Sequence, residues 1–233
     1  MDVVYPLADR SKHGDDFELR YSLRSLAEQS WVDRVFLVGH CPVWARNVEH
    51  IECGDPYQNK DANLIAKVLL ACERSERFVV NSDDQYILTP TDDFGPWADL
   101  LYAPSRSRWS GRVEATRQWC CNHGYSDAVF QSHVPYVVDA ERYRAVMAEA
   151  PWSEGRYGLT THVYLNMTAQ PRGECSAVRI KGPERDPARF IEGRTFLNHN
   201  DAGLNDALRA FLIARFPKPS KWETPPPETG RTR

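Results

Sequence analysis

Long hydrophobic runs, paired cysteine motifs and an excess of charge of one sign are missing from this sequence of 233 residues. No stretch approaches the roughly 20 apolar residues that a membrane-spanning helix needs. The apolar run before Asp9 and Arg10 is too short for the hydrophobic region of a signal peptide. We therefore expect a cytosolic protein that makes no contact with a membrane.

The charges and the cysteines exclude further classes. The sequence has 29 Lys and Arg residues against 32 Asp and Glu residues, a net charge of -3, which argues against a coat of non-specific affinity for nucleic acid and leaves a local basic patch open. The six cysteines form no CxxC pair, and the vicinal Cys120 and Cys121 cannot readily bridge without strain. We expect reduced thiols and no zinc site. The 42% of hydrophobic residues suffice for a full core.

Strand and helix patterns alternate in the first part of the chain. Apolar runs predict strands at residues 2–7, 35–39, 48–51 and 77–81. Apolar residues at helical spacing predict one helix after Asp15 and Asp16, and another over residues 59–73. This alternation predicts an α/β fold in a single domain, with a mostly parallel sheet flanked by helices. Ligands of such sheets bind at the carboxyl ends of the strands.

The pattern weakens in the second part of the chain. Residues 91–132 are rich in Gly, Pro, Ser, Arg and Trp, so we expect loops there, with a short strand around residues 126–131. Asp139 is expected to cap a helix that ends at Pro151.

A last helix is expected near the carboxyl end, where it begins at Asp201 or Asn205. Prolines are frequent from Pro217 onward and predict an extended tail. We therefore divide the chain into a domain of residues 1–216 and a Pro-rich tail of residues 217–233.

The strongest chemical signal is the segment Asn81-Ser82-Asp83-Asp84, which follows an apolar strand. Two carboxylates at the exit of a buried strand are held rigidly and point into the crevice at the strand ends. Such a pair suits a hard divalent cation that bridges a diphosphate. The alternative is an Asp-Asp turn that only solvates the strand end.

Several blocks of the sequence occur in the order seen in Stealth-type transferases. They are residues 17–26, 35–39, 81–84, 133–136, 196–201, 207–212 and 215–223. The resemblance implies a glycosyltransferase A-type (GT-A) fold and an enzyme that moves hexose-1-phosphate from a UDP-sugar onto a glycan.

The start of the chain departs from that family. After Asp2-Val3-Val4-Tyr5 the family continues with a Thr-Trp-Val-x-Gly type of segment and a long insertion, whereas this chain has Pro6-Leu7-Ala8-Asp9. The compact form resembles the short phage-type glycosyltransferases, including those that accompany TET-type dioxygenases and glycosylate 5-hydroxymethylcytosine in DNA. This second resemblance rests on the compact layout and implies a role in DNA modification.

The resemblance assigns ligands for the metal and the donor. It implies that Asp83 and Asp84 bind Mn²⁺ or Mg²⁺ together with the diphosphate of a UDP-sugar, and that His199 is a third ligand or a contact of the diphosphate. A histidine in a surface loop is the alternative for His199. Arg20 could reach the diphosphate as a bidentate donor, or pair with Asp16 on the helix surface.

Two further groups of residues complete the predicted donor side and reaction centre. Lys60, Asp61 and Asn63 lie at a helix N-terminus, where they could hold the ribose or the uracil. For a catalytic base we rank His133 and Asp127 first, ahead of Asp139 and Glu154, because they flank the expected strand. Asp139 is better explained as a helix cap, and His133 could be a core histidine.

A local basic excess marks residues 104–119 in a chain that is otherwise net acidic. Its candidate residues for binding a DNA acceptor are Arg106, Arg108, Trp109 and Arg112. Arginines neutralise phosphates and a tryptophan stacks on an exposed base. A lid whose arginines clamp the donor diphosphate, or a solvated loop, would show the same pattern.

Three functions are consistent with these observations. The first is metal-dependent transfer of a hexose from a UDP-sugar to a hydroxyl, with 5-hydroxymethylcytosine in DNA as the acceptor. The second is the Stealth-type transfer of hexose-1-phosphate to a glycan. The third is a non-catalytic module that binds a sugar nucleotide or a nucleic acid.

Overall fold

The computed structural model describes residues 1–8, 14–98, 102–130, 133–154, 157, 160–173 and 175–224. Within these residues, no helix combines the length and the apolar character needed to cross a bilayer. The elements, in chain order, are β1 (Asp2–Pro6), α1 (Phe17–Leu26), β2 (Val35–Val38), β3 (Glu49–Ile51), α2 (Lys60–Ala71), β4 (Arg77–Val80), β5 (Gln85–Ile87), α3 (Arg108–Asn122), β6 (Tyr136–Asp139), α4 (Ala140–Glu149), the 3-10 turn η1 (Trp152–Glu154), α5 (Thr160–Thr168), β7 (Ala177–Ile180), α6 (Ala188–Ile191), β8 (Phe196–His199) and α7 (Asp206–Arg215).

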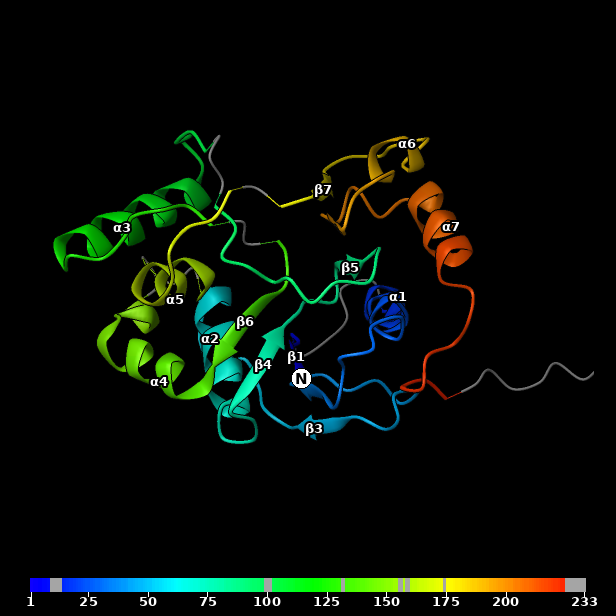
Figure 1. Ribbon diagram of the computed structural model, residues 1–233, viewed down its shortest axis with the longest axis horizontal. Coiled ribbons are helices and arrows are strands. Elements are labelled where there is room, and N and C mark those ends of the chain that lie inside the picture. Colours follow the sequence, from blue (N-terminus) through cyan, green and yellow to red (C-terminus); the bar gives the residue numbers. More distant parts are fainter. Residues whose placement is uncertain are drawn as a thin grey trace, which may run out of the picture.

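A five-stranded sheet forms the centre of the molecule (Figure 1), with the strand order β3-β2-β1-β4-β6. The first four of these strands are parallel, and β6 runs antiparallel to β4. The prediction of a mostly parallel α/β sheet in one domain is therefore confirmed. Because β1 has β2 on one side and β4 on the other, the strand order reverses at β1, where α/β sheets open a crevice for ligands.

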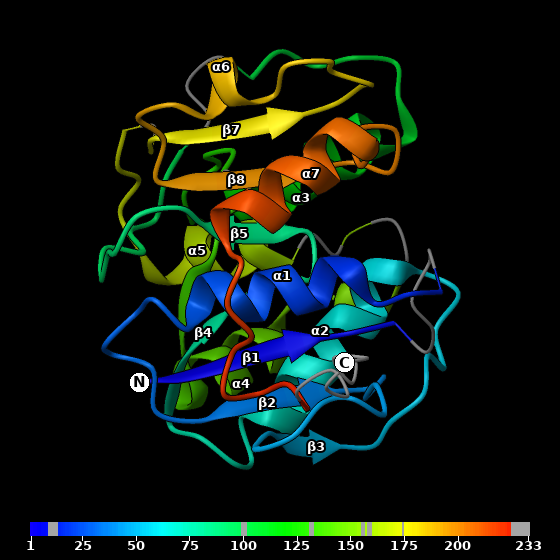
Figure 2. The ribbon, with the colours of Figure 1, turned by 90° about the vertical axis from the view of Figure 1, so that its right-hand side faces the viewer.

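A smaller three-stranded sheet lies beside the first sheet, with the order β5-β8-β7. Figure 2 shows it above α1, while β1, β2 and β3 lie below that helix. The central strand β8 pairs antiparallel with β5 and parallel with β7. This second sheet brings residues from the last quarter of the chain next to Asp84, since β5 starts at the following residue.

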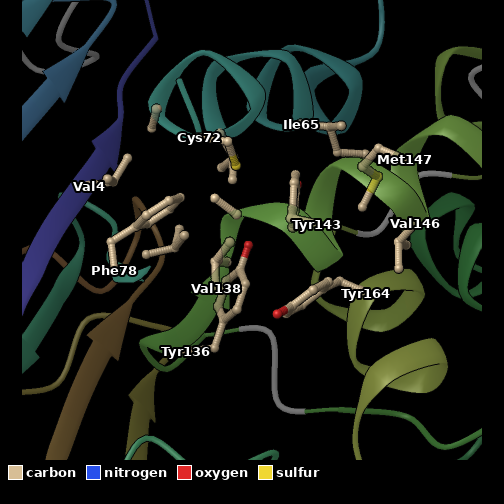
Figure 3. Packing of buried hydrophobic residues seen from close by; sticks show 14 of the residues in the cluster. Val4, Ile65, Cys72, Phe78, Tyr136, Val138, Tyr143, Val146, Met147 and Tyr164 are labelled. Carbon is tan, nitrogen blue, oxygen red and sulfur yellow. The ribbon is translucent and has the colours of Figure 1, made fainter. Parts of the chain in front are cut away.

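Alternating side chains of the central sheet fill two cores, because successive residues of a strand point to opposite faces. Val4 and Val38 pack on one side against α2, α4 and α5. Val3 and Tyr5 pack on the other side against α1. Figure 3 shows the first core, in which strand residues meet helix residues that include Ile65, Cys72, Tyr143, Val146, Met147 and Tyr164.

The helix starts follow the sequence closely. The Asp139 side chain accepts a hydrogen bond from the Arg142 amide and caps α4, as predicted. Asn205, the second of the two candidates, caps α7. At α1 the carboxylate of Asp15 accepts from the amide of Phe17 at 3.1 Å, while Asp16 has a left-handed backbone and makes no side-chain cap.

The expectation of loops over residues 91–132 is wrong in its second half, where α3 forms a helix of 15 residues. Only Ser110, Val113, Thr116 and Cys120 of this helix are buried. The buried stripe is therefore narrow, and the arginines and the glycine around it hide the helical period of apolar residues in the sequence. The strand expected around residues 126–131 is reduced to a single bridge between Ala98 and Phe130, and Gln131 lies outside the described residues.

The start of the proline-rich segment packs against the domain. Trp222 and Glu223 are buried, and Glu223 forms a bridge with Ala45 beside the central sheet. The Glu223 carboxylate binds Arg20 and Arg24 of α1. The rest of the predicted tail, residues 225–233, lies outside the described part of the chain.

Gly39, at the end of β2, supports the first testable prediction. Its φ is +105°, and a Cβ there would press into the backbone carbonyl oxygen of Leu7. We expect Gly39→Ala to destabilise the fold by about 2–4 kcal/mol, from backbone strain and overpacking. Gly111→Ala is the control, because a Cβ at Gly111 meets no atom within 4 Å and the residue lies inside α3. The control should be neutral or stabilising by up to about 1 kcal/mol. Urea denaturation measures both variants, and equal stabilities would contradict the prediction.

Candidate active site

A small cavity opens at the carboxyl ends of β1, β2 and β4, at the point where the strand order reverses. Its lining includes Leu7 after β1, His40 after β2 and Asp83 after β4, together with Asp16 and Glu18 from the start of α1. The Nε2 atom of His40 lies 2.9 Å from the Asp16 carboxylate. The prediction that the site lies at the strand ends agrees with this placement.

Asp83 and Asp84 are half-buried and follow the end of β4 after Asn81 and Ser82. Burial raises the pKa of Asp84 to about 7, and the neighbouring charge of Asp83 adds to this rise. Burial also raises the pKa of Asp83, and the charge of Lys60 partly offsets this effect. Two adjacent carboxylates in this surrounding favour a proton or a cation between them.

Glu18 is a further acid of the site that the sequence did not single out. Its side chain is only 12% exposed. Burial raises its pKa to about 8, with further contributions from the charges of Asp83, Asp84 and Asp201. In the sequence Glu18 resembles any acidic residue in the first turn of a helix. Its position in the site follows only from the fold, which brings the strand ends beside it.

His199, the last residue of β8, is buried beside Glu18. Its Nδ1 donates to the carbonyl oxygen of Asn200 at 3.0 Å, so its Nε2 accepts from the Tyr86 hydroxyl at 3.0 Å. The same Nε2 lies 3.6 Å from the Glu18 carboxylate. Among the described residues, no three His, Cys, Asp or Glu side chains are arranged to hold a metal ion. The structure therefore brings His199 near the acids, but not into a ready set of ligands with them.

Two cations face the acidic pair from different elements. The charge of Lys60, at the N-terminus of α2, lowers the pKa of both Asp83 and Asp84. The charge of Arg179 of β7 also lowers the pKa of Asp84. The sequence did not predict Arg179 as a site residue. A lysine and an arginine around a carboxylate pair can neutralise a bound diphosphate.

The other predicted donor residues belong to the framework around the site. Asp61 forms an ion pair with Arg112 of α3 at 2.9 Å. The side chain of Asn63 donates to the Tyr57 carbonyl and accepts from the Tyr57 amide, both at 2.8 Å. Arg20 binds Glu223 at 3.0 Å and lies over the ring of Trp44. The sequence left open a donor diphosphate or Asp16 as the partner of Arg20, and its partner in the structure, Glu223, is 203 residues away.

The backbone carbonyl of His133 accepts a hydrogen bond from the side chain of Asn198 at 2.9 Å. Burial lowers its pKa to about 3, with further contributions from Arg179, Lys181 and Lys60. The charge of Arg179 thus affects the pKa of both His133 and Asp84. The charge of Lys60 affects the pKa of His133, Asp83 and Asp84. Asp127 is placed elsewhere: its side chain is 56% exposed and pairs with Arg117 at 2.8 Å.

The predicted acceptor residues fall into two groups on α3 and the turn before it. Arg106, Arg108 and Trp109 are exposed, and the ring of Trp109 meets Tyr102 edge to face. Arg112 instead bonds to Asn59 and Asp61 at the start of α2. Arg112 thus joins α3 to the start of α2.

Sequence comparisons find no matching family model, and no curated protein matches the chain. Solved structures do match. A galactosyltransferase, LgtC, solved with donor and acceptor sugar analogs, superposes with a TM-score of 0.54 at 11% identity, covering 95% of this chain and 98% of that one. The apo form of the glycosyltransferase GlyE from Streptococcus pneumoniae TIGR4 gives 0.50 at 10% identity, covering 92% of this chain and 59% of that one.

These likenesses establish the fold. The chain has a GT-A-like glycosyltransferase fold, as the ordered sequence blocks implied. Within that fold, the acids at the end of β4 lie where the strand order reverses.

The acidic cluster predicts an unusual dependence of stability on pH. A folded-state pKa of Glu18 near 8, against an ordinary value of 4.5, means that folding favours the protonated acid. The stability from this group is present below about pH 4.5 and is lost as the pH rises through 8. We expect Glu18→Gln to be more stable than the parent at pH 8 by roughly 2–4 kcal/mol, and near equal at pH 4.5. Urea denaturation without added metal measures this difference, and a difference that does not change with pH would refute the assignment.

Proposed function

We propose that the protein transfers a hexose from a UDP-sugar to a hydroxyl acceptor. The observation that carries the proposal is the half-buried pair Asp83 and Asp84 at the end of β4, faced by Lys60 and Arg179, in a GT-A-like fold. Carboxylates and cations in one crevice match a donor that combines a diphosphate with a divalent metal ion. LgtC, with which the fold superposes, was solved with donor and acceptor sugar analogs, which supports the same class of ligand here.

The acidic pair fits a hard divalent cation such as Mn²⁺ or Mg²⁺. Oxygen ligands suit these ions. Burial, together with the charge of Asp83, raises the pKa of Asp84, so a bound cation would stabilise the charged form of the pair. Asp83 and Asp84 would hold the ion, and diphosphate oxygens and water would complete its shell. When bound, the ion supplies charge stabilisation for the departing UDP. His199 would join these ligands only after it gives up its hydrogen bond with Tyr86.

The chain's own residues account for the remaining parts of the reaction. In the transfer, the bond between the anomeric carbon and the β-phosphate oxygen breaks, the acceptor oxygen bonds to that carbon, and the proton of the acceptor hydroxyl goes to the β-phosphate oxygen of the departing UDP. Lys60 and Arg179 would neutralise the charge that develops on UDP. His133 is neutral at pH 7 and a weak base, so we assign it a hydrogen bond with a sugar hydroxyl. The Asp127 carboxylate forms an ion pair with Arg117, so we do not assign it the role of base.

For the acceptor we propose DNA that contains 5-hydroxymethylcytosine. The exposed Arg106, Arg108 and Trp109 support this acceptor, since they can bind phosphates and stack on a base. The ion pair of Arg112 with Asp61 supports a donor-side role for that residue. The Stealth-type transfer of hexose-1-phosphate remains the second candidate, on the ordered sequence blocks, and it would release UMP where glycosyl transfer releases UDP.

The acidic pair gives the test of the reaction. We expect Asp84→Asn to lower turnover of a UDP-hexose by at least about 100-fold, because the removed charge holds the metal and diphosphate. Asp93→Asn is the control, since Asp93 pairs with Arg172 on an exposed surface. Chromatography of the released nucleotide distinguishes UDP from UMP. Metal-dependent UDP binding that survives in the double variant Asp83→Ala, Asp84→Ala would overturn the assignment, and binding without turnover in the parent would favour the non-catalytic module.

The exposed residues of α3 and of the turn before it give the test of the acceptor. Arg106→Ala and Arg108→Ala should each weaken binding of hydroxymethylated DNA and reduce the log–log salt slope by about one. Trp109→Ala should cost about 1–3 kcal/mol if the ring stacks on a base. Fluorescence anisotropy at several salt concentrations measures these effects, and the affinity for UDP should stay unchanged. Changes confined to UDP-sugar affinity would indicate a donor lid, and no change in either would remove the support for DNA.

A further inference from the structure

The acidic pair stands in a turn between β4 and β5. Asp83 and Asp84 are the two central residues of this turn, which runs from Ser82 to Gln85. The Gln85 amide donates to the Ser82 carbonyl at 3.2 Å, and the Ser82 amide donates to Oε1 of Gln85 at 3.3 Å. Both distances are longer than the usual value of about 2.9 Å. The turn's own hydrogen bonds are therefore weak against the repulsion between two adjacent carboxylates.

A chain of buried polar side chains joins the two ends of this turn. It starts at Asn81, whose Nδ2 donates to the Tyr5 hydroxyl at 3.0 Å. The hydroxyls of Tyr5 and Ser22 lie 2.9 Å apart, and Ser22 donates to the carbonyl of Gln85 at 2.6 Å. The carbonyl of Ser82, at 3.2 Å from the same Ser22 oxygen, is a second and weaker acceptor. The four residues that form the chain are between 0% and 4% exposed.

The two ends of the chain fix the direction of every bond in it. An amide NH₂ group only donates, and a backbone carbonyl only accepts. Ser22 gives its single hydrogen to Gln85, so Tyr5 must donate to Ser22, while its own oxygen accepts from Asn81. Burial raises the pKa of Tyr5, and the charge of Asp83 adds to this rise, so the phenol keeps its hydrogen at pH 7. Each hydroxyl thus donates once and accepts once, and the loss of either one breaks the chain.

The two hydroxyls come from regular elements of the fold. Tyr5 lies in β1 and Ser22 lies in α1, which Figure 2 shows between β1 and β5. At the start of the chain, the backbone amide of Asn81 donates to the Val4 carbonyl of β1 at 2.9 Å. The Oδ1 atom of Asn81 has no hydrogen-bond partner among the described residues, so Nδ2 holds this side chain. The turn is thus tied to the central sheet and to α1 at once.

We propose that Tyr5 and Ser22 are positioning residues that hold the turn of the acidic pair in the shape that binds the metal and diphosphate. This inference rests on the proposed function, because that function gives the acidic pair its ligand. Two carboxylates bind one cation only when both are held at defined places. Removing a group that orients metal ligands typically costs about 10–100-fold in affinity.

The first arm of the experiment measures the turn itself, without metal or nucleotide. Amide hydrogen exchange, followed by NMR, is compared at Gln85 in the parent, Tyr5→Phe and Ser22→Ala. Each variant removes one hydroxyl group and leaves the rest of the side chain in place. We expect exchange at Gln85 to be about tenfold faster in each, the effect of one lost hydrogen bond on local opening. Unchanged exchange at Gln85 overturns the proposal.

Ser25→Ala is the matched control. Ser25 is 0% exposed on the same helix, and its Oγ accepts from the amide of Ile87 at 3.1 Å, two residues beyond the turn. The control should speed exchange at Ile87 and leave exchange at Gln85 within about twofold of the parent. Equally fast exchange at Gln85 in this variant would show that any buried hydroxyl of α1 has the effect, and would overturn the proposal.

The second arm measures the ligand. Calorimetric titration of UDP in Mn²⁺ gives the Kd for the parent, the two variants and the control. We expect the Kd to rise about tenfold or more in Tyr5→Phe and Ser22→Ala, and to stay within about twofold in Ser25→Ala. Because the control also loses a buried hydroxyl of α1, this difference separates positioning of the turn from a general loss of stability. Faster exchange at Gln85 with an unchanged Kd overturns the positioning role.

The two arms also separate this inference from the proposed function. A parent protein that does not bind UDP in Mn²⁺ would refute the proposed function, and the positioning role with it. A parent that binds UDP, with variants that match it in both arms, would overturn the positioning role alone and leave the proposed function standing.

Discussion

The repulsion between carboxylates at the end of β4 is the constraint on which the site depends. Asp83 and Asp84 adjoin in sequence, and Glu18 joins them from α1 within a partly buried space. Like charges there raise one another's pKa unless a cation or a proton intervenes. Burial and then the charge of Asp83 raise the pKa of Asp84 to about 7, although the charges of Lys60 and Arg179 lower it. The fold thus holds a charge pattern that a metal and diphosphate together would complete.

The elements that hold these charges are fixed by contacts far away in sequence. Glu18 is positioned by α1, and α1 is held by the buried Glu223, which binds Arg24 through two guanidinium nitrogens and Arg20 through one. Removing one partner from a buried ion pair leaves an uncompensated charge, which strongly destabilises the fold. The start of the proline-rich segment therefore belongs to the framework of the site, because without it the helix that carries Glu18 would lose its anchor.

The sequence predicted what local patterns encode, and it failed where partners are distant. The strands β1, β2 and β4, the helix α2 and the acids after β4 all follow from apolar runs and spacing within a few residues. The short strands β5, β7 and β8 have three or four residues each, too few for a period to emerge, and they exist because they pair with one another. The ion-pair partners of Arg20 and Asp127, which are Glu223 and Arg117, are visible only in the fold for a related reason. Glu18 and Arg179 were missed because nothing local distinguishes them from surface charges.

The side chains of β8 face two different surroundings. Because successive side chains of a strand point to opposite faces, His199 lies with Tyr86 and Glu18 on one face, while Asn198 lies on the other and donates to the backbone carbonyl of His133. Arg179 lies opposite Asn198 in the pairing of β7 with β8 and therefore shares that second face. The charge of Arg179 affects the pKa of Asp84 as well as that of His133. One strand thus places a histidine beside the buried acid Glu18 and an asparagine beside a cation that acts on the acidic pair.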